Sequence, residues 1–179
     1  MKPEIETNLE IDTKMHVNKL FTLVFLKKNK SVLLGLKTRG LGKGFWNGFG
    51  GKVEKNETVM DCAKRELKEE CNLEAKDLKQ IGVVRYDLLH DNSSDVVHIF
   101  TCTQFEGVEK PSEEMNPIQW YKFRAIPFTQ MWPDSPHWYP YMLDEKYFSA
   151  RITYSDENTI KGSSIQVYNN LSNVLKIAE

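Results

Sequence analysis

Hydrophobic and polar positions alternate along this chain in short runs, a pattern that predicts strands. The first two runs, residues 20–28 and 31–37, are rich in β-branched and aromatic side chains and are separated by Asn29-Lys30. Two such runs joined by a pair of residues are typical of a hairpin. Further strands are predicted at residues 80–89, 95–105, 117–123, 148–154 and 165–168.

A helix is predicted over residues 58–71, where the apolar positions change to helical spacing. Thr58 and Asp61 have the spacing of a capping box at its start. The apolar stripe that should face the core consists of Val59, Ala63 and Leu67. Shorter helical pieces are predicted at residues 128–131 and 136–147. Strands and helices together indicate an α+β fold in which a mixed sheet is flanked by helices.

Three carboxylates lie on the other side of this predicted helix. Residues three and four apart share a helix face, so Glu66 is a neighbour of both Glu69 and Glu70. Two unit charges about 4 Å apart repel by roughly 4 kcal/mol at an effective dielectric near 20, so the cluster is costly unless it faces water or a cation. Oxygen ligands favour Mg²⁺ or Mn²⁺ over zinc. The cluster therefore predicts a hard-cation site, and its alternative is a solvated acidic face.

Glycines are concentrated just before this helix. Residues 40–51 hold six of the ten glycines in the chain. Glycine allows positive φ and a close backbone approach, so this loop suits a phosphate chain held by backbone N–H groups. It is not a P-loop, because Gly44 follows Lys43 where Ser or Thr is needed, and the dinucleotide-binding spacing is not met either. Read alone, the glycines favour a flexible loop over a phosphate site.

Read together, the loop and helix resemble the signature of the Nudix family, G-x5-E-x7-R-E-U-x-E-E-x-G-U, in which U is aliphatic. The matching residues are Gly51, Glu57, Arg65, Glu66, Leu67, Glu69, Glu70 and Leu73. Asn72 stands where the signature has glycine, and asparagine is the next most tolerant residue of a left-handed helix end. The resemblance implies the Nudix α/β/α sandwich, and we expect one such domain over residues 19–179 after a loose tail at 1–18.

Segments outside the signature resemble the animal MutT-like branch, which hydrolyses oxidised purine nucleoside triphosphates. They are LLGLKTRGLGKGFWNGFGGKV, SEEMNPIQW and IPFTQMWPD. The resemblance implies cleavage to a monophosphate and pyrophosphate, with Arg65 orienting Glu69 one helical turn later. It implies the catalytic residues Arg65, Glu66, Glu69 and Glu70. The implied metal ligands are the Gly50 carbonyl, Glu66, Glu69, Glu70 and Glu114.

Base recognition is implied at other positions. Trp132 offers a flat partner for a purine, Asp134 a polar edge, and Asn47 both a donor and an acceptor. The remaining residues expected to bind substrate are Thr22, Lys37, Phe49, Gly50, Gly51, Lys52, Pro133 and Ser135. Ser135 replaces a second acid usual in this branch, and Leu41 replaces an aromatic residue. We therefore expect an altered ranking of 8-oxo-dGTP, 2-hydroxy-dATP and alkylated guanine nucleotides.

Composition agrees with a small anionic ligand. The formal net charge is −1, so no global basic field favours a nucleic-acid polymer. The apolar run at residues 21–26 is far shorter than the roughly 20 residues that span a bilayer, and no targeting segment is evident. Three cysteines, an odd number, favour reduced thiols. We expect a cytoplasmic monomer, with the mitochondrial or nuclear nucleotide pool as alternative locations.

Two alternative functions remain open from the sequence. The first is a Nudix hydrolase of another diphosphate, such as capped RNA or a dinucleotide. The second is a module that binds nucleotides without catalysis, against which the intact glutamates argue.

Overall fold

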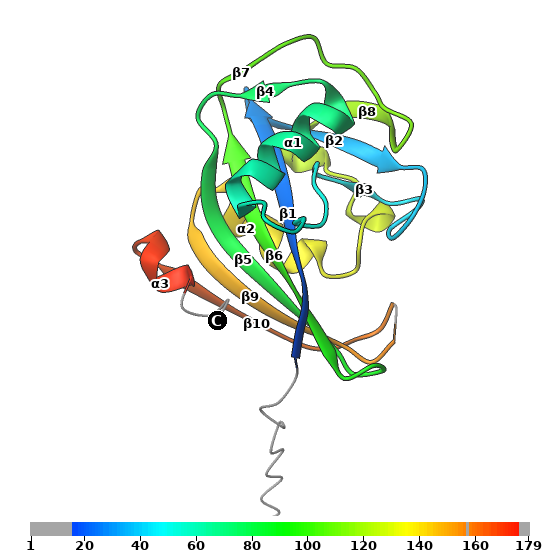
Figure 1. Cartoon of the computed structure of the whole chain (residues 1–179), viewed down its shortest axis with the longest axis vertical. Coiled ribbons are helices and arrows are strands. Elements are labelled where there is room, and N and C mark those ends of the chain that lie inside the picture. Colours follow the sequence, from blue (N-terminus) through cyan, green and yellow to red (C-terminus); the bar gives the residue numbers. More distant parts are fainter. Residues whose placement is uncertain (1–15, 157, 176–179) are drawn as a thin grey trace, which may run out of the picture.

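The computed structural model describes residues 16–156 and 158–175. A long, curved sheet forms the body of the molecule, with α1 across one face and α2 behind it (Figure 1). The strands are β1 (His16–Lys28), β2 (Ser31–Lys37), β3 (Trp46–Asn47), β4 (Glu74–Ala75), β5 (Lys79–Leu88), β6 (Ser93–Cys102), β7 (Phe105–Glu106), β8 (Met115–Lys122), β9 (Tyr147–Tyr154) and β10 (Ile160–Tyr168). The helices are α1 (Val59–Cys71), α2 (Ser135–Leu143) and α3 (Leu171–Leu175), with short 3₁₀ turns η1 (Phe123–Ala125) and η2 (Phe128–Gln130).

The main sheet has the order β10-β9-β5-β6-β1-β2-β3, and β8 pairs with β2. It is mixed, because β1 runs parallel to β6 and β5 parallel to β9 while the other pairs are antiparallel. Strand β1 is central and carries core on both faces: Val24 and Leu26 pack toward α1, whereas Phe25 packs toward α2. This burial explains why β1 reads as a continuous apolar run.

The predicted hairpin is confirmed, and its shape opens the site. Asn29 and Lys30 both have positive φ, at 51° and 55°, as a two-residue hairpin turn requires. Ladder pairs join β1 and β2 only next to this turn, at Lys27↔Val32 and Lys28↔Ser31. Farther along, β1 is bridged by the chain that follows β3, at Val24↔Phe49 and Phe21↔Lys52. The glycine-rich segment is thereby held against β1 beneath α1.

Helix α1 forms as its pattern predicts. The Thr58 hydroxyl accepts from the Asp61 backbone N–H at 3.1 Å, and Asn72 closes the helix in the left-handed conformation with φ 62°. Ala63 and Leu67 are fully buried, and Val59 packs beside them. The stripe is therefore core, as expected.

Other boundaries differ from the prediction. Strand β1 begins at His16, so residues 16–18 of the predicted tail belong to it, and residues 1–15 lie outside the described residues. These first positions pair with Ser93 and Ser94 of β6. Backbone pairing does not require an apolar side chain, so this part of the strand shows no hydrophobic pattern from which to predict it. The second predicted helix ends at Leu143, because the chain turns at Glu145, with φ 55°, and begins β9. No helix in the described ranges is long and apolar enough to cross a membrane.

Candidate active site

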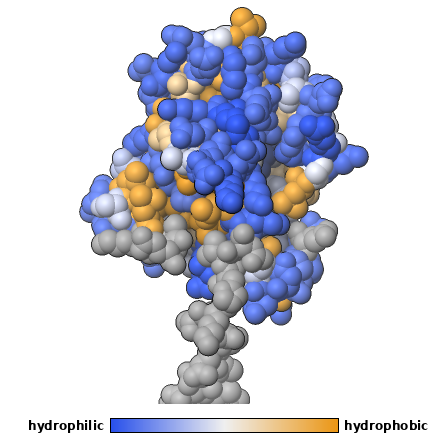
Figure 2. Space-filling model, viewed as in Figure 1, coloured by the Kyte–Doolittle hydropathy of each residue, from blue (hydrophilic) through white to orange (hydrophobic). Residues whose placement is uncertain are grey.

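One cleft of about 1080 Å³ runs from α1 to the start of α2. Its walls come from β1, the glycine-rich loop, the middle of α1 and the ends of β5 and β9. Hydrophilic residues predominate on the molecular face over α1 (Figure 2). The cleft thus combines charged groups on one side with aromatic groups from α2, β5 and β9 on the other.

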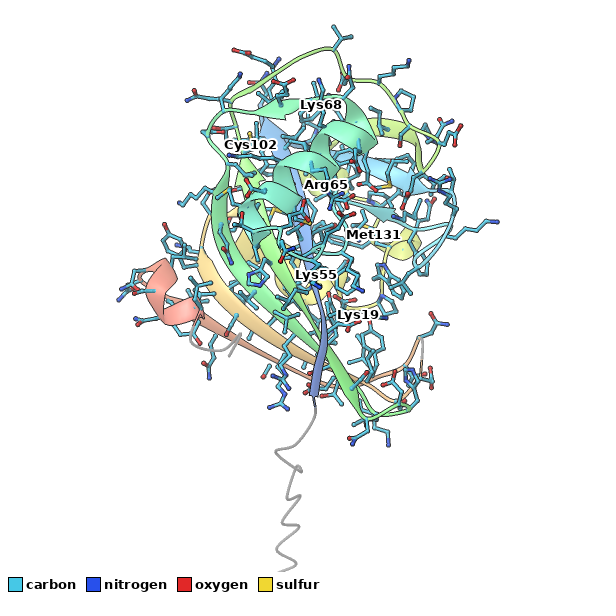
Figure 3. All side chains as sticks on the ribbon, viewed as in Figure 1. Lys19, Lys55, Arg65, Lys68, Cys102 and Met131 are labelled. Carbon is cyan, nitrogen blue, oxygen red and sulfur yellow. The ribbon has the colours of Figure 1, made fainter. Side chains whose placement is uncertain are left out.

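Arg65 lies in the middle of α1 (Figure 3). It forms ion pairs with three carboxylates. Its strongest contacts are with Glu57, at 2.7 Å from Nε and 3.0 Å from Nη2. Its Nη1 donates to Glu66 at 2.7 Å and to Glu69 at 3.2 Å. The hydrogen bond from Arg65 lowers the pKa of Glu57 from its ordinary 4.5 to about 2. Arg65 therefore contacts Glu69 as expected, but its principal partner is Glu57, which is bonded bidentately.

Glu70 is buried against the glycine-rich loop, with 3% of its surface exposed. The Gly50 N–H donates to Glu70 Oε2 at 2.8 Å. Glu70 Oε1 is buried and has no hydrogen bond within the described residues, and its nearest cation is Lys37 Nζ at 3.5 Å. Burial raises the pKa of Glu70 to about 7, against the lowering influence of Lys37. Glu70 therefore does not lie on an open acidic face beside Glu69.

Two glycines fit this packing closely. A Cβ on Gly51 would overlap the Glu66 carboxylate, and a Cβ on Gly50 would overlap the Thr22 carbonyl. The Thr22 N–H also donates to the Gly51 carbonyl at 2.9 Å. Glycine is therefore required at position 50, where the backbone of β1 approaches, whereas a side chain at position 51 would displace the Glu66 carboxylate.

Glu114, in the loop just before β8, reaches the same region from a distant part of the sequence. The Lys37 ammonium pairs with Glu114 Oε1, and Arg39 Nη2 lies 3.4 Å from its other oxygen. The hydrogen bond from Lys37 lowers the pKa of Glu114. Lys37 thus lies between Glu114 and Glu70, rather than pointing only at a substrate.

The predicted convergence of carboxylate oxygens is not formed in this arrangement. Among residues 16–156 and 158–175, no group of three acidic, histidine or cysteine side chains is placed to hold a metal ion. The reason is that Arg65 draws Glu66 and Glu69 to itself while Lys37 separates Glu70 from Glu114. Arg65 and Lys37 therefore offset the repulsion among these carboxylates, a role that the sequence alone suggested for a bound metal.

The aromatic half of the cleft contains Trp132, Asp134 and Asn47. Trp132 packs against Phe45, with ring centroids 5.1 Å apart. Asn47 Oδ1 accepts from the Gly48 N–H at 2.9 Å and from the Tyr139 hydroxyl at 3.2 Å, which leaves its amide N–H₂ for a ligand. Contacts within the protein therefore orient both Trp132 and Asn47.

Asp134 is 2% exposed and accepts three hydrogen bonds. The donors are the Tyr86 hydroxyl, the Trp138 indole and the Tyr154 hydroxyl. Sequence reasoning missed Tyr86 and Tyr154. The signal for Tyr86 was weak: it lies within the predicted strand at residues 80–89, where an aromatic side chain is ordinary.

Most of the predicted substrate-binding residues line the cleft. They are Thr22, Lys37, Asn47, Gly50, Gly51, Lys52, Trp132, Asp134 and Ser135. Phe49 is a correction, because its side chain is fully buried and packs with α1 in the core. Pro133 is exposed and does not line the cleft, since the chain turns there to place Asp134 inward.

Comparison with known proteins agrees with this geometry. The NUDIX domain model matches residues 18–142. The oxidized purine nucleoside triphosphate hydrolase of Mus musculus is 41% identical over 152 residues, which cover 85% of this chain and 97% of that protein. The protein of the same name from Danio rerio is 42% identical, covering 82% and 93%.

Solved structures share the fold. The MutT protein from Bacillus halodurans superimposes with a TM-score of 0.75 at 21% identity, covering 83% of this chain and 98% of that one. A bifunctional NMN adenylyltransferase/ADP ribose pyrophosphatase from Francisella tularensis, solved with AMP and a manganese ion, gives 0.58 at 18% identity, covering 73% and 42%. Signature, fold and sequence identity agree, and the chain belongs to the NUDIX domain family.

Proposed function

We propose that this protein hydrolyses oxidised purine nucleoside triphosphates, such as 8-oxo-dGTP and 2-hydroxy-dATP, to the monophosphate and pyrophosphate. One observation supports this above the others: a single cleft joins the carboxylates around Arg65 to an aromatic pocket that holds Trp132 and Asp134. The named activity of the mouse and zebrafish relatives supports the same substrate class. Acting on the cytosolic nucleotide pool, the enzyme would remove damaged nucleotides before their incorporation.

The residues present fit a divalent cation. Glu70 Oε1 is a buried oxygen without a hydrogen bond within the described residues. Glu66, Glu69 and Glu114 line the cleft and supply further oxygen donors, whereas Glu70 lies behind the Gly50 backbone that lines it. An all-oxygen donor set favours Mg²⁺, with Mn²⁺ as a substitute. The Gly50 carbonyl, Glu66, Glu69, Glu70 and Glu114 would hold it. When bound, such an ion supplies neutralisation of phosphate charge and lowers the pKa of a water molecule.

The chain's own residues do the remaining work. Arg65 holds Glu66 and Glu69 in the cleft, and both carboxylates would turn from its guanidinium to meet a cation. A glutamate of this set accepts the proton of the attacking water. Lys37 is the cation best placed to move from its two carboxylates to a phosphate. Trp132 supplies a face for the base.

A turnover assay tests the proposal. Pyrophosphate release should be faster with 8-oxo-dGTP or 2-hydroxy-dATP than with dGTP, and it should require a divalent ion. Glu69→Gln should lower kcat about a hundredfold or more, because a positioned carboxylate contributes that much. Glu69 is 59% exposed, so its variant should still fold. Glu74→Gln is the control, since Glu74 is similarly exposed and pairs with Lys68 outside the cleft.

Two results would contradict the proposal. Equal turnover of dGTP and 8-oxo-dGTP would remove the damage specificity, and normal turnover by Glu69→Gln would remove the site. A larger diphosphate substrate is the second candidate, because the cleft continues past Asp134 to His90 and Asn158. Preferred cleavage of a dinucleotide or capped RNA in the same assay would favour it.

A further inference from the structure

Asp134 is held from three sides at the base end of the cleft. The Tyr86 hydroxyl and the Trp138 indole both donate to Oδ2, each at 2.7 Å. The Tyr154 hydroxyl donates to Oδ1 at 2.8 Å. Trp138 lies in α2, the helix that Asp134 directly precedes, whereas the two tyrosines come from the neighbouring strands β5 and β9. Both tyrosines line the cleft beside Asp134.

This arrangement fixes what Asp134 can do for a ligand. An ionised carboxylate has about four acceptor positions and no donor. Three of these are taken, two on Oδ2 and one on Oδ1, so a single acceptor position on Oδ1 remains. A group that meets this oxygen must therefore donate a hydrogen bond. A ligand lone pair in the same place would leave two acceptors facing each other.

The two hydroxyls stay donors under working conditions. Burial, with the nearby Asp134 charge, raises the pKa of both tyrosines above the ordinary 10, so both are neutral at neutral pH. Ser135, the next residue in the cleft wall, has a hydroxyl that donates or accepts, so it does not impose the same selection.

We propose that Tyr86 and Tyr154 are positioning residues that fix Asp134 as a hydrogen-bond acceptor toward the purine, and that they thereby select bases presenting an N–H group. Guanine donates from N1 and N2 whether or not it is oxidised, so the selection acts at the edge that carries N7. Oxidation at C8 converts N7 from an acceptor into an N–H donor, so at this edge 8-oxo-dGTP offers a donor that dGTP lacks. The tyrosine hydroxyls therefore contribute to discrimination against the undamaged nucleotide. This inference rests on the proposed function.

A purely structural role predicts something different. If the hydroxyls only satisfied a buried carboxylate, their removal would lower stability and leave the choice between two nucleotides unchanged. Tyr86→Phe and Tyr154→Phe remove one oxygen each and keep the rings, whose centroids are 6.2 Å apart. Tyr168→Phe is the matched control, because its hydroxyl donates to Gln166 on β10 outside the cleft.

The measurement is the ratio of kcat/KM for 8-oxo-dGTP to kcat/KM for dGTP, for wild type, each single variant and the double variant. This ratio is internal to each preparation, so partial unfolding does not change it. We expect it to fall about threefold to tenfold in each single variant, mainly through KM for 8-oxo-dGTP, because one hydrogen bond to a charged group is affected. The ratio should fall further in the double variant, and the ratio for Tyr168→Phe should match that of wild type.

An unchanged ratio in the double variant, within twofold, overturns the inference whatever happens to overall activity. If wild type prefers 8-oxo-dGTP and the double variant keeps that preference, only the tyrosine role fails. If wild type hydrolyses neither nucleotide, the proposed function and the inference fail together.

Discussion

At the scale of single residues, the site is organised by paired charges rather than by an open acidic cluster. Arg65 donates two hydrogen bonds to Glu57 and one each to Glu66 and Glu69 on its own helix. Lys37 contacts both Glu70 and Glu114. Arg65 and Lys37 both reduce the electrostatic repulsion among the carboxylates. Removing one partner of either ion pair should therefore change the free energy of unfolding measurably, even without substrate.

The Glu57 pair gives the first prediction, an effect of pH on stability. The folded pKa of Glu57 is lowered from 4.5 to about 2, so its stabilising contribution is complete above pH 4.5 and is lost as the pH falls through about 2. The free energy of unfolding of wild type should exceed that of Glu57→Gln above pH 5, and the difference should shrink between pH 4.5 and 2. Urea unfolding across this range measures it. A difference between wild type and Glu57→Gln that stays flat over this range would refute the pairing.

Lys37 gives the second prediction. Lys37→Met should be destabilised by about 2 kcal/mol in chelator, because Glu70 and Glu114 lose the cation between them, and Tm should fall by roughly 4–8 °C. Magnesium should raise the Tm of this variant more than that of wild type, since the ion then replaces the lost charge. Thermal unfolding with EDTA and with magnesium tests both parts. Arg39→Met, which removes a mostly exposed cation, should shift Tm little, and an unchanged Lys37→Met would show that the lysine does not neutralise the cluster.

At the scale of elements, helix α1 is the part that the sequence predicted best. Its cap, its buried stripe and its left-handed end at Asn72 all follow local rules that act within one turn. The burial of Glu70 could not be predicted in this way, because it depends on the Gly50 N–H, which another segment brings to the helix. The contact of Lys37 with Glu114 likewise requires β2 and the loop before β8 to lie side by side.

The helix end gives the third prediction. Asn72 adopts φ 62°, and its side-chain amide also donates to the Val108 carbonyl at 2.9 Å. Asn72→Gly removes this hydrogen bond but relieves the left-handed conformation, so stability should change by less than about 1 kcal/mol. Asn72→Ala loses the hydrogen bond and also tolerates the left-handed conformation poorly, so its free energy of unfolding should be lower by about 2 kcal/mol. Urea unfolding distinguishes them, and equal stability of the two variants would contradict the assigned cap.

At the scale of the whole molecule, the fold brings distant parts of the sequence to one cleft: β1 with its glycine-rich partner, α1, the ends of β5 and β9, the loop before β8, and the start of α2. The sequence motif predicted the chemistry of α1, and the family that it indicated is confirmed. It did not identify Tyr86 and Tyr154, because their position beside Asp134 depends on the β5–β9 pairing, which no local pattern encodes. A mixed sheet of this kind brings together segments that are distant in the sequence. Tertiary contacts therefore determine whether residues such as Tyr86 and Tyr154 belong to the site.

The distribution of charge over the molecule gives the last prediction, which concerns coupling between nucleotide and metal. The formal net charge is only −1, so no global field attracts or repels an anion, and the carboxylates of the cleft dominate locally. A phosphate should therefore bind weakly without a divalent ion, and each ligand should raise the affinity for the other by the same factor, because coupling free energy is reciprocal. We expect a factor of about ten for 8-oxo-dGMP and magnesium, measured by calorimetry on the wild-type protein, because 8-oxo-dGMP is the product of the proposed reaction and is not hydrolysed further. The uncharged nucleoside 8-oxo-deoxyguanosine is the matched control, since its binding should not depend on magnesium. Equal magnesium dependence of the nucleotide and the nucleoside would show that the carboxylates do not govern phosphate binding, because only the nucleotide carries the charge that they repel.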